Sequence, residues 1–253
     1  MFSKIGKYKP CGIFTKGHFI LIGITISMIM YALKHSMPKN KEDVYKIIRK
    51  ITVIMCILEI IRIIYSISQN SLYEVNTYLP LYYCSMLLYA GILSSFAKGK
   101  LKRVGDVFLA TGSIIGGIVF IIYPSTSLLG YPAFHFLSIH SFLFHGIMIY
   151  IGILVNKTEY IEVKKEDIKY FAGLVGVVCI LALIVNNIFD SNLMFISQNF
   201  NIAPIEMLYK ITNGTVLFSF IMSVGQMTIP FYLTYYIIKL KNYSISSIKS
   251  ITN

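Results

Sequence analysis

Charge is what this sequence lacks most. Only 13% of its 253 residues are Asp, Glu, Lys or Arg, against roughly 25% in a typical soluble domain, while 56% are hydrophobic. The core of a soluble domain of this length cannot absorb so many apolar side chains. The scarcity of charge therefore excludes an ordinary soluble domain and points to a membrane protein.

Cysteine is also scarce, and tryptophan is absent. The four cysteines are widely spaced and contain no Cys-x-x-Cys pair, so the sequence supports neither a zinc site nor a disulfide framework, and we expect no metal and no other cofactor. They are Cys11, Cys56, Cys84 and Cys179. The absence of Trp beside abundant Ile, Lys and Asn is typical of an AT-rich bacterial genome.

Long apolar runs, in contrast, recur along the whole chain. At about 1.5 Å rise per residue, each can cross the roughly 30 Å hydrocarbon core as a helix. The sequence therefore predicts an all-α membrane protein with a bundle of about seven transmembrane helices, six or seven. We expect residues 1–253 to form one polytopic domain, located in the cell membrane. The expected spans are His18 to Leu33, Ile51 to Ile67, Leu79 to Phe96, Val107 to Tyr123, Phe134 to Val155, Tyr170 to Ile188 and Val216 to Leu240.

The basic residues between these spans indicate the topology, because cytoplasmic loops carry the excess of Lys and Arg. The loops after the first, third and fifth spans carry six, four and four of them, those after the second and fourth carry none, and that after the sixth carries Lys210. We therefore expect the amino terminus outside and the carboxyl terminus in the cytoplasm. The four lysines that precede the first span conflict with this orientation, and a first segment that is cleaved or lies on the surface would resolve it.

The net charge of +12 raises the question of nucleic-acid binding. The basic residues lie almost entirely between apolar runs, and no recognition module of the usual kinds is present. This distribution fits membrane topology and anionic headgroups instead, so we expect membrane lipids as partners and no nucleic acid. The sequence leaves the oligomeric state open.

Few polar residues lie inside the expected spans, and each is a functional hypothesis because a charge at the bilayer centre costs about 2.5 to 3.5 kcal/mol. In the second span, the segment LEIIRIIY places Glu59 and Arg62 three residues apart, on one helical face where they can pair. The pair is equally compatible with a site and with simple fixation of helix packing.

The third and fifth spans carry the groups that could do chemistry. The third opens with LPLYYCSM, in which Pro80 suits a helix start and Cys84 lies about one turn further in. The fifth contains His135, His140 and His145, and five-residue spacings turn a helix by about 140°, so the three cannot share a face and do not form a metal motif. His140 and His145 lie deeper, where a neutral imidazole can serve as a general base.

The sixth span ends in VNNIFDSNLMFI, with Asn186, Asn187, Asp190 and Asn192 at its outer end. Such residues are common in caps and turns. Together with Arg62, Cys84 and His140, however, Asn187 falls in the outer half of its span. This convergence indicates a polar pocket that opens outward.

These motifs carry a family resemblance. LPLYYCSM, PAFHFLSIHSFLFHG and VNNIFDSNLMFISQNFNIAP, within Glu59 to Ile221, resemble the YwaF-like bacterial integral membrane proteins. Those are distantly similar to vertebrate transmembrane proteins in which a Cys and a His are held to carry acyl transfer between phospholipids. The resemblance places the family cysteine at Cys84 and its histidine at His145, with His140 at a usually polar position.

Three hypotheses for the function stay open. In the first, a thiol-dependent acyltransferase or acyl hydrolase, Cys84 attacks a lipid ester, His145 or His140 accepts the proton, and Arg62 or Asn187 steadies the oxyanion or phosphate. The residues expected to contact the substrate are Glu59, Arg62, Asn187 and Asn192. In the second, the same polar side chains line a cavity that binds or carries a lipid or small solute without catalysis. In the third, they only hold the helices together.

Overall fold

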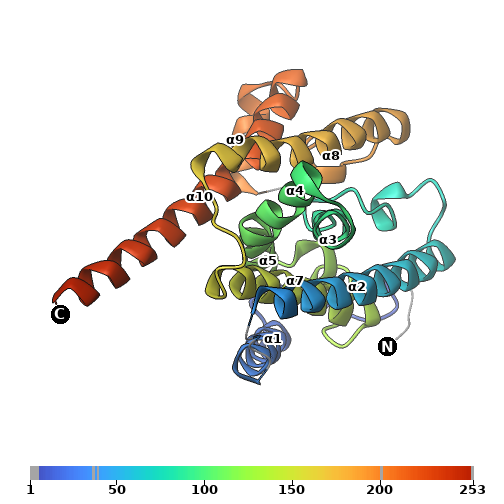
Figure 1. The fold of residues 1–253 in the computed structure, drawn as a ribbon. Coiled ribbons are helices and arrows are strands. Elements are labelled where there is room, and N and C mark those ends of the chain that lie inside the picture. The colour runs from blue at the N-terminus through green and yellow to red at the C-terminus, as the bar shows by residue number, and fades with distance from the viewer. Residues whose placement is uncertain (1–5, 36–37, 39, 200–201, 252–253) are drawn as a thin grey trace.

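The computed structural model describes residues 6–35, 38, 40–199 and 202–251, and within these ranges the chain forms helices and no strand (Figure 1). Six helical segments are long and apolar enough to cross a membrane, which confirms the all-α membrane fold. They are α1 (Lys16–His35), α2 (Lys41–Gln69), the pair α4 (Gly99–Ala110) and α5 (Gly112–Ile122), α7 (Phe136–Lys157), α8 (Ile168–Phe189) and α10 (Val216–Ile251). The shorter helices are α3 (Met86–Phe96), α6 (Ser125–Leu128) and α9 (Ala203–Ile211), with 3-10 turns η1 (Val75–Thr77), η2 (Lys165–Asp167) and η3 (Leu193–Phe195).

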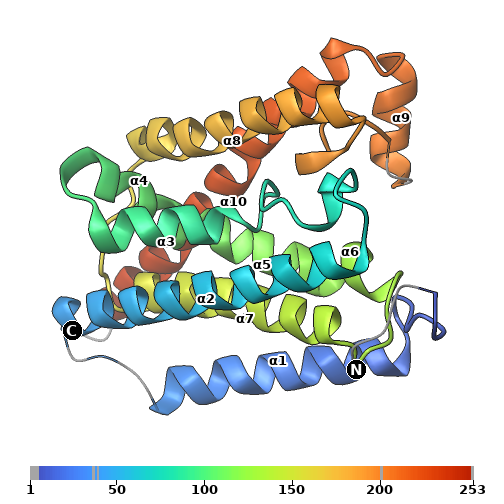
Figure 2. The same cartoon turned by 90° about the vertical axis from the view of Figure 1, so that its right-hand side faces the viewer.

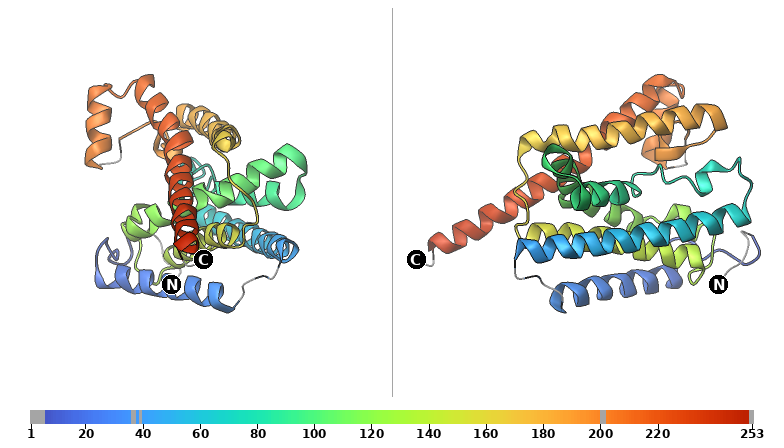
Figure 3. Two further views of the ribbon diagram at one scale, coloured as in Figure 1. Left: turned by 60° about the vertical axis from the view of Figure 1, so that its left-hand side comes forward. Right: turned by 45° about the vertical axis from the view of Figure 1, so that its right-hand side comes forward.

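The α4–α5 segment and α7 form the centre of the bundle. Their apolar windows are 67% and 72% buried, whereas those of α1, α2, α8 and α10 are 17% to 28% buried. The exposed faces of these outer helices carry Ile, Leu, Val and Phe side chains, which suit contact with lipid. Figure 2 shows that the axes of α1, α2 and α7 are roughly parallel. Figure 3 shows that the carboxyl end of α10 projects beyond the bundle.

The third expected span differs from the structure. Only Met86–Phe96 of it is helical, and these 11 residues, at about 1.5 Å each, are too short for a membrane of about 30 Å. The preceding residues 78–85 form a non-helical segment that leads back along the bundle toward α3 (Figure 2). Side chains bind carbonyl groups in its first half: Arg62 Nη2 donates to Tyr78 O at 3.0 Å, and Tyr89 Oη of α3 donates to Pro80 O at 2.7 Å. The carbonyl groups of residues 82–85 accept from backbone N–H groups three residues further on. The described bundle therefore has six helical crossings, and the third passage is only partly helical.

The crossing formed by α4 and α5 is also interrupted. Thr111, between α4 and α5, has φ −122° and ψ −75°, which breaks the helical hydrogen-bond series. Its carbonyl accepts from Thr234 Oγ1 of α10 at 3.2 Å, and that of Ala110 accepts from Asn156 Nδ2 of α7 at 2.7 Å. Because unpaired backbone groups are costly in a membrane, these contacts allow a break inside the core.

The start of α1 and the end of α10 lie at opposite ends of the bundle (Figure 2). η1, α6 and α9 gather at the end where α1 begins, and the α3–α4 turn and the α7–α8 loop lie at the other. At this second end, Lys102 Nζ donates to both carboxylate oxygens of Asp106 at 3.0 Å and to Tyr160 Oη at 2.7 Å. Burial raises the pKa of Tyr160, so its phenol stays neutral and accepts this bond. Which end faces the cytoplasm stays a prediction from the loop charges.

Candidate functional site

An ion pair on α2 forms the centre of the candidate site. Arg62 Nη2 donates to Glu59 Oε1 at 2.7 Å, and both side chains are largely buried, 17% and 8% exposed. The pairing predicted from the three-residue spacing is thus confirmed. A buried charge pair of this kind stabilises a protein only where further hydrogen bonds satisfy the remaining atoms.

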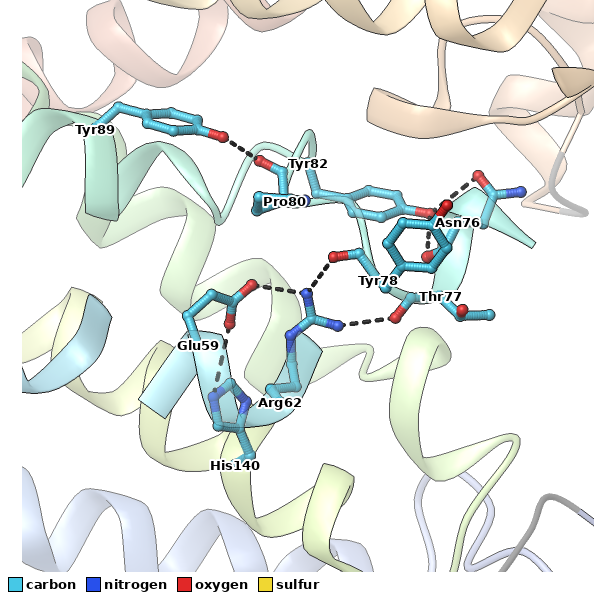
Figure 4. Close-up of polar contacts among 9 residues, drawn as sticks. All are labelled: Glu59, Arg62, Asn76, Thr77, Tyr78, Pro80, Tyr82, Tyr89 and His140. Carbon is cyan, nitrogen blue, oxygen red and sulfur yellow. Dashed lines mark hydrogen bonds and ion pairs between the residues drawn. The ribbon is translucent and has the colours of Figure 1, made fainter. Parts of the chain in front are cut away.

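Arg62 makes these further bonds to the chain itself. Its Nη1 donates to Thr77 O at 2.8 Å and its Nη2 to Tyr78 O at 3.0 Å (Figure 4). These carbonyls lie where η1 leads into the non-helical segment before α3. The guanidinium therefore holds the entry of that segment against α2, and it is engaged with backbone groups rather than free for a substrate.

His140 of α7 approaches the ion pair at the second carboxylate oxygen of Glu59, the one that Arg62 does not bind. Its Nε2 lies 3.7 Å from Glu59 Oε2, so the carboxylate sits between the imidazole and the guanidinium (Figure 4). The His140 side chain is 5% exposed, and its Nε2 has no hydrogen-bond partner among the described residues. A buried imidazole nitrogen without a partner is unusual and is available to accept or donate a proton.

Cys84 lies at the end of the same non-helical segment. It directly precedes Ser85, the N-cap of α3, and its side chain is partly buried. Its thiol lies within electrostatic range of both Glu59 and Arg62. The structure thus brings Cys84, Glu59, Arg62 and His140 into one region, from α2, α7 and the start of α3.

His145 lies elsewhere. Its ring stacks on Phe120 of α5, with centroids 3.6 Å apart and an angle of 9° between the planes, and its Nδ1 is bonded to Ser141 O at 2.7 Å. Five residues along α7 turn the helix by about 140°, which directs His140 toward α2 and His145 toward α5. Of the two histidines, His140 is the one that the structure places beside Glu59.

The asparagines at the end of α8 divide between surface and interior. Asn187 is exposed, whereas its neighbour Asn186 is 4% exposed. Asn186 Oδ1 accepts from Leu193 N and Ser191 Oγ, both at 2.8 Å, and Nδ2 donates to Leu193 O at 3.1 Å. The sequence placed Asn186 beside Asn187 at the end of this span but indicated only Asn187 as a site residue, although Asn186 continues the buried face of Cys179 and Ala182 at helical spacing.

Asn192 shapes the loop after α8. Its Oδ1 accepts from Ser197 N and Gln198 N, both at 3.0 Å, and its own N–H donates to Asn76 Oδ1 at 3.1 Å. Tyr82 Oη also donates to Asn76, so this loop is tied to the segment that carries Cys84. Asn192 therefore organises the surroundings of the site, and its amide is engaged with the chain. No group of three potential metal ligands occurs among the residues that the structure describes.

Fold and site together define a polytopic helical membrane protein with a buried carboxylate–guanidinium–imidazole cluster beside a cysteine. A family model, that of the TMEM164 family, matches residues 13–228. Because this match covers most of the chain, the protein belongs to the TMEM164 family. Comparisons with curated proteins and with solved structures gave no match.

Proposed function

We propose that this protein transfers acyl chains of membrane lipids through a thioester on Cys84. The observation that carries the proposal is the Glu59–His140 pair, in which His140 Nε2 lies 3.7 Å from Glu59 Oε2, together with the Cys84 thiol within electrostatic range of the same Glu59. Nucleophilic cysteines need a base for the thiol proton and a third group that orients the base. The resemblance of LPLYYCSM to the YwaF-like proteins, which are distantly similar to vertebrate proteins held to transfer acyl groups, supports Cys84 as the nucleophile. The same resemblance places the family histidine at His145, and the contact with Glu59 favours His140 instead.

In the proposed reaction, His140 accepts the proton of the Cys84 thiol, and Sγ attacks the carbonyl carbon of a lipid ester. The C–O bond breaks, the lysolipid alcohol leaves with the proton from His140, and the acyl group stays on sulfur. A second lysolipid, or water, then attacks the thioester, gives its proton to His140, and restores the thiol when the C–S bond breaks. With an alcohol as acceptor the protein is an acyltransferase, and with water it is an acyl hydrolase.

The charged groups have supporting roles in this reaction. Glu59 orients His140 and stabilises the imidazolium that forms after proton transfer. Arg62 holds the segment before α3 through Thr77 O and Tyr78 O. The amino end of α3, which directly follows Cys84, offers the positive end of a helix dipole to the oxyanion.

The test uses the purified protein in nanodiscs with a phospholipid that carries a labelled acyl chain and an unlabelled lysolipid acceptor. Cys84→Ala should abolish both transfer and release of the label. His140→Gln should lower the rate by about 10² to 10⁴, the usual contribution of a general base. His145→Gln is the matched control and should retain most of the activity. Unchanged transfer in Cys84→Ala would remove the thioester from the proposal.

A non-catalytic role is the second candidate, and one observation favours it. Three hydrogen bonds of Arg62 go to Glu59 and to the backbone, so this cluster is also suited to holding the broken passage together. On this alternative, Cys84→Ala and His140→Gln would leave the lipid composition of cells unchanged, and only variants that weaken folding would have an effect.

A further inference from the structure

Tyr83, the residue before Cys84, is seated against α5 in a slot that two glycines leave open. Gly112 and Gly116 lie four residues apart, on one face of this helix. A Cβ atom at Gly116 would lie 2.8 Å from Tyr83 Cε1 and 3.0 Å from Cδ1, and one at Gly112 would lie 2.7 Å from Tyr83 Oη. Cβ atoms do not approach other atoms so closely, so the ring occupies this position only because both residues are glycines.

Further contacts fix the tyrosine in the slot. Its hydroxyl donates to Gly112 O at 3.4 Å, and its ring lies 5.8 Å from that of Phe108, measured between centroids. Met148 Cε would also lie 2.9 Å from a Cβ at Gly116, but the end of a methionine side chain moves at low cost. The rigid ring of Tyr83 is therefore the group that an added methyl would displace.

The neighbouring tyrosine is held on the other side of the segment. Tyr82 Oη donates to Asn76 O at 3.1 Å, and its ring lies 5.4 Å from that of Phe195, in the loop after α8. Cys84 follows two aromatic anchors that are attached to different elements. Such double attachment is what a nucleophile needs when it lies on a non-helical segment, because a displacement of about 1 Å can lower a rate about 100-fold.

We propose that Gly112, Gly116 and Tyr83 are positioning residues that place the Cys84 sulfur relative to the Glu59–His140 pair. This inference rests on the proposed acyl transfer for its effect on rate, whereas its effect on the position of the thiol is independent of that reaction. A Cβ at Gly112 would also lie 2.6 Å from Phe171 Cε2 and 2.7 Å from Phe108 Cε2, so Gly112 makes room for three rings. At Gly116 an added methyl group meets only Tyr83 and the movable end of Met148, so its effect on the segment depends on the Tyr83 ring in the slot.

The experiment uses the full chain in nanodiscs with Cys11, Cys56 and Cys179 replaced by Ala, so that Cys84 is the only thiol. Two quantities are measured for each variant: acyl transfer from the labelled phospholipid, and the rate of Cys84 alkylation by N-ethylmaleimide as a function of pH. The variants are Gly116→Ala and, as the matched control, Gly173→Ala in α8, where a Cβ meets nothing within 4 Å.

We expect Gly116→Ala to lower acyl transfer at least tenfold and to shift the pH profile of alkylation, with a Tm close to that of Gly173→Ala. In the Tyr83→Ala background, adding Gly116→Ala should change neither quantity further, because the ring that transmits the displacement is gone. Parental values in Gly116→Ala, or an equal change in both backgrounds, would overturn the positioning role.

Two further outcomes keep this inference separate from the proposed function. If Cys84→Ala retains transfer, the thioester proposal fails, and the alkylation profiles alone decide whether the slot positions the thiol. If Gly116→Ala does not fold, Tyr83→Phe and Tyr83→Leu replace it: the alkylation profile should stay parental with the ring retained in Phe and shift with the ring lost in Leu. Identical alkylation profiles in the two variants would refute the claim that the Tyr83 ring positions the Cys84 thiol.

Discussion

Replacing Arg62 by Met tests whether the ion pair of α2 holds the third passage of the chain. The change leaves the Glu59 carboxylate, 8% exposed, without its guanidinium partner, and it removes the donors to Thr77 O and Tyr78 O. Loss of one partner of a buried pair costs about 3 to 5 kcal/mol. At about 2 to 4 °C for each kcal/mol in a chain of this size, we expect the Tm to fall by roughly 10 °C.

Two companion variants separate charge from hydrogen bonding. The double variant Glu59→Met, Arg62→Met should be more stable than Arg62→Met alone, because no unpaired carboxylate remains in the interior. Arg62→Lys should lie between the parent and Arg62→Met, since an ammonium group lacks the planar fork that reaches several acceptors at once. Thermal unfolding in nanodiscs, followed by circular dichroism, measures all three. A Tm of Arg62→Met within 2 °C of the parent value would refute this reasoning.

Further predictions concern helix packing and the loop after α8. Gly105→Ala should prevent folding, because its Cβ would overlap the backbone of Ala90 in the α3–α4 hairpin. Gly23→Ala, with open space around the added methyl group, should be neutral. The yield of monodisperse protein in detergent measures both effects. Asn186→Ala should lower stability by about 1 to 3 kcal/mol, because it leaves buried groups of the loop unpaired, and Asn187→Ala should have no effect on the Tm.

Local spacing along the sequence predicted part of the site well. Glu59 and Arg62 lie on one continuous helix, so their three-residue separation alone placed them within bonding distance. The apolar runs likewise located the six helical crossings, because a helix in a membrane satisfies its own backbone and needs only sufficient length. These features depend on neighbours in the sequence and not on the rest of the fold.

Features that depend on contacts between distant segments could not be predicted in this way. The choice between His140 and His145 is decided by the rotation of α7 against α2 and α5, and no pattern within α7 fixes that rotation. Asn186 and Asn187 also differ in the face of α8 that each occupies: Asn186 shares the face of Cys179 and Ala182, and the packing of α8 decides that this face is buried. In both cases the packed neighbours determine which of two similar residues faces the interior.

The charge on Arg62 and the missing helical turns before α3 are two aspects of one arrangement. In a membrane, a non-helical segment persists only where other groups bind its backbone, and Arg62 binds the carbonyls of Thr77 and Tyr78 there. Glu59 compensates the positive charge of Arg62, and its other carboxylate oxygen lies 3.7 Å from His140 Nε2. The break that leaves Cys84 outside a regular helix is thus stabilised by the same ion pair that places an imidazole in the region of its thiol.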